Sequence, residues 1–294
     1  MLLCLASGAA FGAMAVFGKL AYDGGATVGT LLSVRFALAA VLFWAIVLVR
    51  GASRPSRRDC VAGLALGAVG YSLQAGCYFA ALERIDASLL SLVLYTFPAI
   101  VAVAAVALGR ERLDARRMTA LGLATGGLGL VVAGAGAGAL DPLGTSLALA
   151  AALVYSAYIL IGEGIAKRLS PLVLSALICT GAAITLTAAT AALGDLRPDR
   201  LTAAGWGWLA ALAAVSTVAA VSLFFAGLKR VGPTTASILA TVEPLVTVVL
   251  AFLVFGETLG GIQLAGGALV LGAVLALQLK PVAIRYTTTR EAHA

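Results

Sequence analysis

Charged residues are scarce in this sequence of 294 residues: Asp, Glu, Lys and Arg together make up 11% of it, whereas 62% of the residues are hydrophobic. A water-soluble domain has roughly a quarter of its residues charged, because its surface must face water. A composition this apolar, with a mean hydropathy of +1.06, excludes a soluble globular domain. Its long continuous apolar runs favour membrane-spanning helices over the short alternating strands of a β-barrel.

Residues that support catalysis and metal binding are also rare. The single histidine, His293, lies in the polar C-terminal tail, and the sequence has neither an H-E-x-x-H nor a G-x-S-x-G motif. We therefore expect no metal site, no cofactor and no enzymatic activity. No C-x-x-C pair occurs among Cys4, Cys60, Cys77 and Cys179, which lie in or beside apolar runs. We interpret them as buried free thiols.

Ten apolar runs are long enough to cross a bilayer, which takes about 20 helical residues. They cover residues 2–22, 27–49, 59–82, 86–108, 117–135, 142–166, 170–193, 205–228, 233–255 and 260–279. The connections between them are short and carry charges, Gly or Pro. The sequence therefore predicts an all-α integral membrane protein of ten transmembrane helices, without an extramembrane domain.

Basic residues are distributed unevenly between the two sides of the predicted bundle. If the N-terminus is inside, fifteen of the twenty Lys and Arg residues fall in cytoplasmic segments, four fall outside, and Arg35 lies within a span. Basic residues collect in the cytoplasmic loops of membrane proteins. We therefore predict that both termini are cytoplasmic. The net charge of +7 is explained by this bias, and we expect no nucleic-acid partner.

The same spacing of a proline and a glutamate occurs twice in the chain. Pro98 precedes Glu111 by thirteen residues, as Pro244 precedes Glu257, and the two copies are 146 residues apart. The same shift places "YFAALERIDASLLSLVLYTFPAIVAV" over "FFAGLKRVGPTTASILATVEPLVTVV". With five spans in each copy, the second copy must enter the membrane in the opposite direction.

Inverted repeats of this kind are typical of secondary transporters, whose substrate site lies between the halves near the midplane. We predict two five-helix repeats, residues 1–139 and 140–281, around a central cavity. A polar cytoplasmic tail, residues 282–294, follows them.

The segments "FPA…GRE" and "EPL…FGE", together with an early "FG…GK", resemble the drug/metabolite transporter superfamily, and specifically its EamA-type ten-helix exporters. Within that superfamily the chain looks most like YddG-type amino-acid exporters. The resemblance implies alternating-access export of small amphipathic metabolites, first of all amino acids, across the bacterial inner membrane. A multidrug or other-metabolite exporter is the main alternative; a channel and an integral-membrane enzyme are further ones. Phe11 stands where many relatives carry Trp, so no aromatic contact is carried over there.

Polar side chains form matching stripes on corresponding spans. Hydroxyl-bearing residues precede Pro98 at helical spacing, and the 146-residue shift reproduces the pattern before Pro244. We predict that both prolines bend their helices. The candidates for the substrate path are Gln74, Tyr78, Ser88, Ser91, Tyr95, Tyr155, Tyr158, Ser237 and Thr241. The competing interpretation is that Ser and Thr join packed helices and that Tyr marks the membrane interface.

Four charged residues are candidates for coupling or gating. Glu243 lies in an apolar run, where an acid costs about 2.5–3.5 kcal/mol, and is either a protonatable coupling group or a neutral acid between helices. Arg35 either pairs with Glu243 or extends toward the interface. Glu111 and Glu257 either cap their helices or act as gates. The expected partners are a small-molecule substrate, the lipid bilayer and, if transport is proton-coupled rather than uniport, protons.

Overall fold

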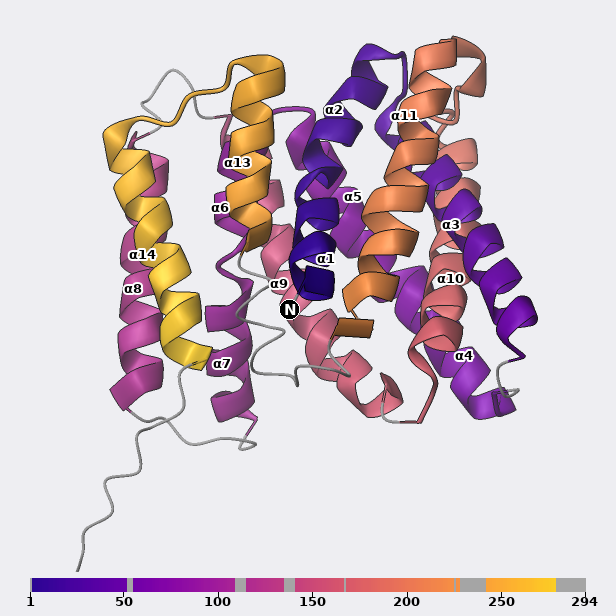
Figure 1. The fold of residues 1–294 in the computed structure, drawn as a ribbon, viewed down its shortest axis with the longest axis horizontal. Helices are drawn as coiled ribbons and strands as arrows, with labels where there is room; N and C mark the ends of the chain where they lie inside the picture. Colours follow the sequence, from indigo (N-terminus) through magenta and orange to yellow (C-terminus); the bar gives the residue numbers. More distant parts are fainter. Residues whose placement is uncertain are drawn as a thin grey trace, which may run out of the picture.

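The structure, a computed structural model, describes residues 2–51, 55–108, 115–134, 141–166, 168–224, 226–227 and 242–278. This described part is helical throughout and forms one bundle of long helices that stand side by side (Figure 1). The elements are α1 (Leu2–Gly12), α2 (Met14–Asp23), α3 (Val28–Arg50), α4 (Arg57–Ala65), η1 (Leu66–Tyr71), α5 (Ser72–Leu82), α6 (Ala87–Leu94), α7 (Phe97–Ala107), α8 (Ala115–Gly134), α9 (Pro142–Ala166), α10 (Pro171–Ala192), η2 (Pro198–Arg200), α11 (Ala203–Ala213), η3 (Ala214–Ala219), α13 (Val242–Phe255) and α14 (Gly261–Gln278).

Within the described residues, six helical stretches are long and apolar enough to cross a membrane. They are Leu2–Asp23, Val28–Arg50, Arg57–Leu82, Pro142–Gly162, Pro171–Ala192 and Ala203–Phe224. Shorter apolar helices over Met118–Val131, Val242–Phe255 and Gly261–Ala276 fall in three more predicted spans. The prediction of an all-helical membrane protein is confirmed.

The predicted fourth span is divided in two, because α6 ends at Leu94 and α7 begins at Phe97. Proline lacks an N–H and its ring clashes with the carbonyl four residues back, which for Pro98 is that of Leu94, so α6 ends there. Nearby hydroxyls accompany the break. Thr96 Oγ1 donates to the Val93 carbonyl at 2.8 Å, and Ser156 Oγ donates to the Phe97 carbonyl at 3.2 Å.

Two π-helical segments, which the sequence did not predict, lie in the third and eighth spans. η1 and η3 occupy corresponding places in the two halves. Ser72 Oγ donates to the Gly67 carbonyl at 2.9 Å, and Thr217 Oγ1 donates to the Leu212 carbonyl at 3.1 Å, each five residues back. Single π-turns inside α-helices occur frequently at functional sites. The paired π-turns therefore mark these two spans as candidates for the functional region.

The contacts between helices repeat from one half to the other. α3 packs along α10, and α8 packs along α14. α5 packs on α9, while α2 packs on α11 and α1 on η3; α6 contacts α13. Exchanging the two halves maps these pairs onto one another, as expected for two inverted copies of one five-helix unit.

Glycines allow the closest helix crossings. A Cβ at Gly127 of α8 would meet the Gly266 carbonyl of α14 at 2.7 Å, so the two backbones touch there. A Cβ at Gly67 would likewise collide with the Ile178 backbone of α10. A Cβ at Gly122 or Gly126 of α8 would find nothing within 4 Å, so these two glycines do not make such a crossing.

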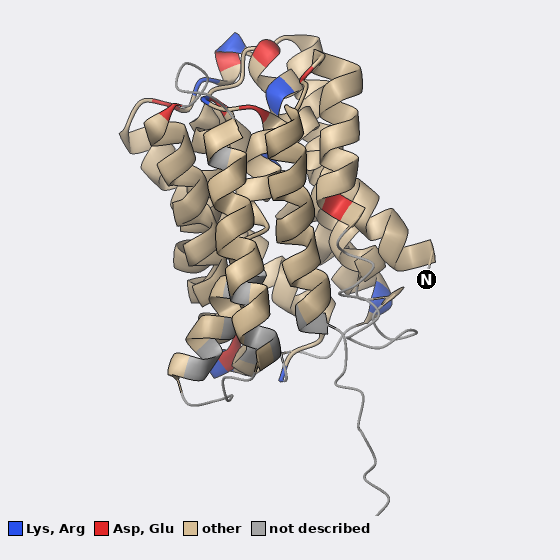
Figure 2. Ribbon diagram, turned by 90° about the vertical axis from the view of Figure 1, so that its left-hand side faces the viewer, with Lys and Arg blue, Asp and Glu red and all other residues tan. Residues whose placement is uncertain are grey.

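Charged residues gather near the two ends of the bundle, and most of its length carries none (Figure 2). α2, α5, α8, α10 and α13 end at the upper end of Figure 1, whereas α3, α7, α9 and α14 end toward the lower one. The helices thus alternate in direction through the layer that the membrane would occupy.

Candidate functional site

Six aromatic side chains form a continuous series through the bundle, which we call the aromatic row. In order of contact they are Phe36, Tyr71, Tyr158, Tyr155, Phe97 and Tyr95. Successive ring centroids are 5.1, 5.5, 6.0, 4.7 and 5.8 Å apart, within the range of favourable aromatic pairing. Phe36 and Tyr95, at the two ends, are buried, and the four middle rings are half-buried. The row thus offers partly accessible apolar surface between two buried ends.

One end of the row meets a carboxylate. Tyr95 Oη donates to Glu243 Oε2 at 2.9 Å. Within the described residues, Glu243 lies in the first turn of α13, beside the buried Pro244. The Glu243 backbone lies close to Gly12, where a Cβ would meet its carbonyl at 2.7 Å, and Thr247 Oγ1 donates to the Gly12 carbonyl at 3.0 Å. Glu243 therefore sits where the first span, the fourth span and α13 meet.

The other end of the row meets a guanidinium. Arg35 on α3 is 1% exposed, and its charge lies over the rings of Phe36 and Phe79 at 5.0 and 5.2 Å. Its Nε donates to Thr217 Oγ1 at 3.0 Å, and its Nη2 donates to Met14 Sδ at 3.2 Å. The sequence proposed that Arg35 pairs with Glu243 or extends to the interface. The structure shows neither: the side chain is buried, and no ion pair joins these two described residues.

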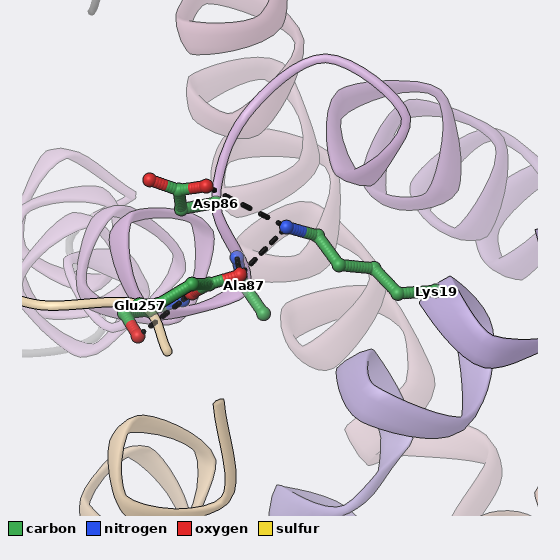
Figure 3. A network of polar contacts seen from close by, with 5 residues as sticks. Lys19, Asp86, Ala87 and Glu257 are labelled. Atoms are coloured by element: carbon green, nitrogen blue, oxygen red, sulfur yellow. Dashed lines mark hydrogen bonds and ion pairs between the residues drawn. The ribbon is translucent and has the colours of Figure 1, made fainter. Parts of the chain in front are cut away.

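A second polar group lies at the upper end of the bundle; we call Lys19, Asp86, Ala87, Ser88 and Glu257 the Glu257 cluster (Figure 3). Lys19 Nζ lies 2.6 Å from Glu257 Oε1 and 3.6 Å from Asp86 Oδ1. The N–H groups of Ala87 and Ser88 donate to the Glu257 carboxylate at 3.2 and 3.1 Å, and Ser88 Oγ donates to it at 3.0 Å. This carboxylate thus joins α2 and the start of α6 to the loop after α13.

Glu257 caps a helix of the other half. The first N–H groups of a helix lack partners within it, and Asp86, at the N-cap position of α6, makes no side-chain capping bond. Glu257 supplies the missing acceptor, and its negative charge suits the positive end of the helix dipole. Burial alone would raise the pKa of Glu257. The bonds from Lys19, Ser88 and Ala87 outweigh burial and hold that pKa below its ordinary value of 4.5.

The remaining predicted site residues are distributed between these regions. Ser88 belongs to the Glu257 cluster, and Ser91 is buried one turn below it in α6. Gln74 and Tyr78 are buried in α5, where Tyr78 packs edge-on against Phe79 with ring centroids 5.1 Å apart. Pro98 lies in the first turn of α7. Ser237, Thr241 and Glu111 lie outside the described residues.

The sequence analysis missed the apolar members of the site. Phe36 and Phe97 belong to the aromatic row, but neither was a candidate because the search followed polar stripes. The 146-residue shift did place Phe97 opposite Glu243. In the structure both residues contact Tyr95, so the repeat itself carried the missing signal.

A cavity of about 430 Å³ lies between α7, α8 and α9 and is largely apolar. Its lining includes Thr96, Ile100, Leu128, Leu149 and Leu153. Leu149 and Leu153 belong to α9 of the second half and the other lining residues to the first half, so this cavity lies at one contact between the halves. Its lining includes none of the predicted substrate-path residues, and the predicted central cavity stays a prediction.

These features define a class of protein. The described part of the chain is a bundle of membrane-spanning helices whose contacts repeat between halves, and it contains no cluster of residues that could hold a metal ion. Its buried polar groups meet where helices of the two halves pack. This is the architecture of a secondary membrane transporter.

Comparisons with known proteins agree on the family. The chain matches the family model of the EamA-like transporter family over residues 1–133 and 142–278. An "Uncharacterized transporter" of Archaeoglobus fulgidus is 30% identical over 259 residues, which are 84% of this chain and 86% of that protein. The "Uncharacterized transporter YcbK" of Bacillus subtilis is 26% identical over 265 residues, covering 87% and 85%.

A crystal structure that is 21% identical in sequence has the same fold, with a TM-score of 0.64 over 94% of this chain and 95% of that one. The chain belongs to the EamA-like transporter family of the drug/metabolite transporter superfamily. It is a multi-pass membrane transporter and not an enzyme.

Proposed function

We propose that the protein exports small amphipathic metabolites, first of all amino acids with aromatic or hydrophobic side chains, by alternating access. The observation that carries this proposal is the aromatic row between Arg35 and Glu243. Half-buried rings suit an apolar side chain, and one buried cation suits a single carboxylate. Multivalent anions suit the site poorly, because Arg35 is its one fixed cation among the described residues.

Competition between solutes tests the substrate class. Purified protein in liposomes should take up labelled phenylalanine saturably. Unlabelled aromatic and aliphatic amino acids should compete with it, while sugar phosphates should not. Competition by cationic drugs without competition by amino acids would contradict the proposal and favour a multidrug exporter.

We further propose that the membrane is the bacterial inner membrane and that the end holding the Glu257 cluster faces outward. The opposite end, where α3 and α9 end and α4 begins, holds Arg50, Arg57, Arg58 and Arg168, which supports its assignment to the cytoplasm. In this orientation the Glu257 cluster joins the two halves at the outer end. The described conformation is then the one closed to the outside.

Labelling of introduced cysteines tests this orientation. Ser56, before α4, and Gly260, before α14, are both exposed and lie at opposite ends of the bundle. In a background without native cysteines, a membrane-impermeant maleimide added to intact cells should label Gly260→Cys. It should label Ser56→Cys only after the membrane is opened. Labelling of both positions from the same side would contradict the inverted repeat.

A further inference from the structure

Arg35 differs from the described Lys and Arg residues that form ion pairs. Lys19, Arg84 and Arg168 each lie within 4 Å of a carboxylate, although their side chains are 21%, 42% and 49% exposed. Arg35 is 1% exposed, yet no carboxylate pairs with it within the part that the structure describes. Among the described residues, the most deeply buried of these cations is therefore the one without a carboxylate partner.

The neighbours of Arg35 offset its burial only in part. A thioether is a weak acceptor, and the hydroxyls of Thr217 and of Tyr71, which also interacts with the guanidinium, are neutral. The rings of Phe36 and Phe79 lie within 6 Å, where an aromatic face attracts a cation. Such contacts hold a guanidinium in place without neutralising it. Charged groups inside a membrane protein commonly mark a substrate or ion pathway for this reason.

The position of Arg35 also indicates a ligand site. Its side chain, from α3 in the first half, reaches Thr217 in the π-segment η3 of the second half. Met14 begins α2 in the first span, directly after Ala13, which separates α1 from α2. Phe36, the ring beneath the guanidinium, is the first member of the aromatic row. The charge therefore lies between the halves, at the start of a path of partly accessible rings.

We propose that Arg35 binds the carboxylate of the transported solute, while the aromatic row takes its apolar side chain. A planar guanidinium matches a carboxylate through two parallel N–H bonds. Two of its five N–H donors meet Thr217 and Met14, which fix its orientation. This assignment rests on the proposed function, because it takes an amino acid as the substrate.

Three solutes with one phenyl ring test the assignment: phenylalanine, phenethylamine, which lacks the carboxylate, and 3-phenylpropanoate, which lacks the amine. Calorimetry on purified wild type should show tighter binding of the two carboxylates than of the amine. Arg35→Met should weaken carboxylate binding about ten- to hundredfold and leave phenethylamine binding unchanged. Arg35→Lys should give an intermediate loss. Arg84→Met, at the exposed Arg84–Asp141 pair, serves as the matched control and should change nothing.

If Arg35→Met weakens the binding of all three solutes equally, the assignment is overturned. A preference for the carboxylates that survives in Arg35→Met would overturn it as well. If Arg35→Met does not fold, Arg35→Lys and the wild-type series decide, and a wild type that binds no carboxylate better than the amine overturns it. Arg35-dependent binding of 3-phenylpropanoate without transport of any amino acid would support Arg35 as the carboxylate site and contradict the proposed function. If phenylalanine is transported but its binding does not depend on Arg35, the proposed function is supported and the assignment of Arg35 as the carboxylate site is contradicted.

Discussion

If Glu243 is the proton-coupling residue, Glu243→Gln should abolish accumulation driven by a pH gradient and leave substrate exchange intact. Glutamine keeps an oxygen that accepts the Tyr95 Oη bond, now 2.9 Å long, and therefore preserves the local packing. It cannot carry a proton. In a one-to-one exchange, a gradient of one pH unit can drive about tenfold accumulation, because it is a tenfold ratio of proton concentrations, which corresponds to about 1.4 kcal/mol. In liposomes, we expect about tenfold accumulation of phenylalanine by the wild type and none by the variant.

Counterflow separates a coupling defect from a folding defect. Exchange of labelled for unlabelled substrate needs no net proton movement, so Glu243→Gln should still perform it at a rate similar to wild type. Glu243→Asp, the matched control, retains a titratable group and should retain some coupling. Full gradient-driven transport by the glutamine variant would exclude Glu243 as the coupling residue and leave facilitated diffusion as the mechanism.

Glu257→Ala should open the outer end of the protein. The substitution removes the ion pair with Lys19 and the acceptor for the first N–H groups of α6 in one step. Ser91, 4% exposed and one turn below the cluster, is a suitable reporter when replaced by cysteine in a background without native cysteines. We expect the rate of its labelling from outside to rise about tenfold, which corresponds to about 1.4 kcal/mol in the closed–open equilibrium.

Two control variants test whether the faster labelling depends on the Glu257 carboxylate. Glu257→Gln keeps an acceptor for the Ala87 and Ser88 N–H groups but loses the charge, so labelling should rise less than in the alanine variant. Arg84→Gln breaks the exposed pair with Asp141 at the same end, and such surface pairs contribute little. In the Arg84→Gln variant, the rate at which the cysteine at position 91 is labelled should stay within about twofold of the rate without that substitution. An unchanged rate in Glu257→Ala would mean that the cluster does not hold the outer end closed.

The pH dependence of this closure follows from Glu257. Its pKa in the folded state is lowered, so the stabilisation that it gives is present above its ordinary pKa of 4.5 and is lost as the pH falls through the lowered value. The ratio of reporter labelling to that of an exposed control cysteine should therefore be constant between about pH 8 and pH 5. An increase in this ratio near neutral pH would show that another titrating group controls the closure.

The sequence predicted the features that depend on local chemistry. A lipid environment forces long apolar helices, so the spans could be identified from hydropathy alone. The break before Pro98 follows from the missing N–H of proline, and the 146-residue shift anticipated the repeated helix contacts. Glu257 was interpreted as a capping or gating residue, but the helix that it caps belongs to the other half, and only the tertiary structure places Ala87 and Ser88 within its reach.

Side-chain direction was less accessible to sequence reasoning. Period-3.6 patterns show which residues share a helix face but not what that face meets. Arg35 was therefore expected to reach Glu243 or the interface, whereas it lies between two phenylalanine rings and Thr217. In helices this apolar, aromatic residues that line a path and those that fill a core look alike, which is why Phe36 and Phe97 were not recognised.

The central claim is that an amino acid moves through a carrier that opens to one side at a time, and trans-stimulation tests it most directly. Liposomes containing the purified protein are preloaded with unlabelled phenylalanine, and entry of labelled phenylalanine is then measured without any ion gradient. We expect preloading to accelerate entry several-fold and to produce a transient overshoot above equilibrium, with a rate that saturates with concentration. Entry that is linear in concentration and indifferent to preloading would contradict alternating access and indicate a channel.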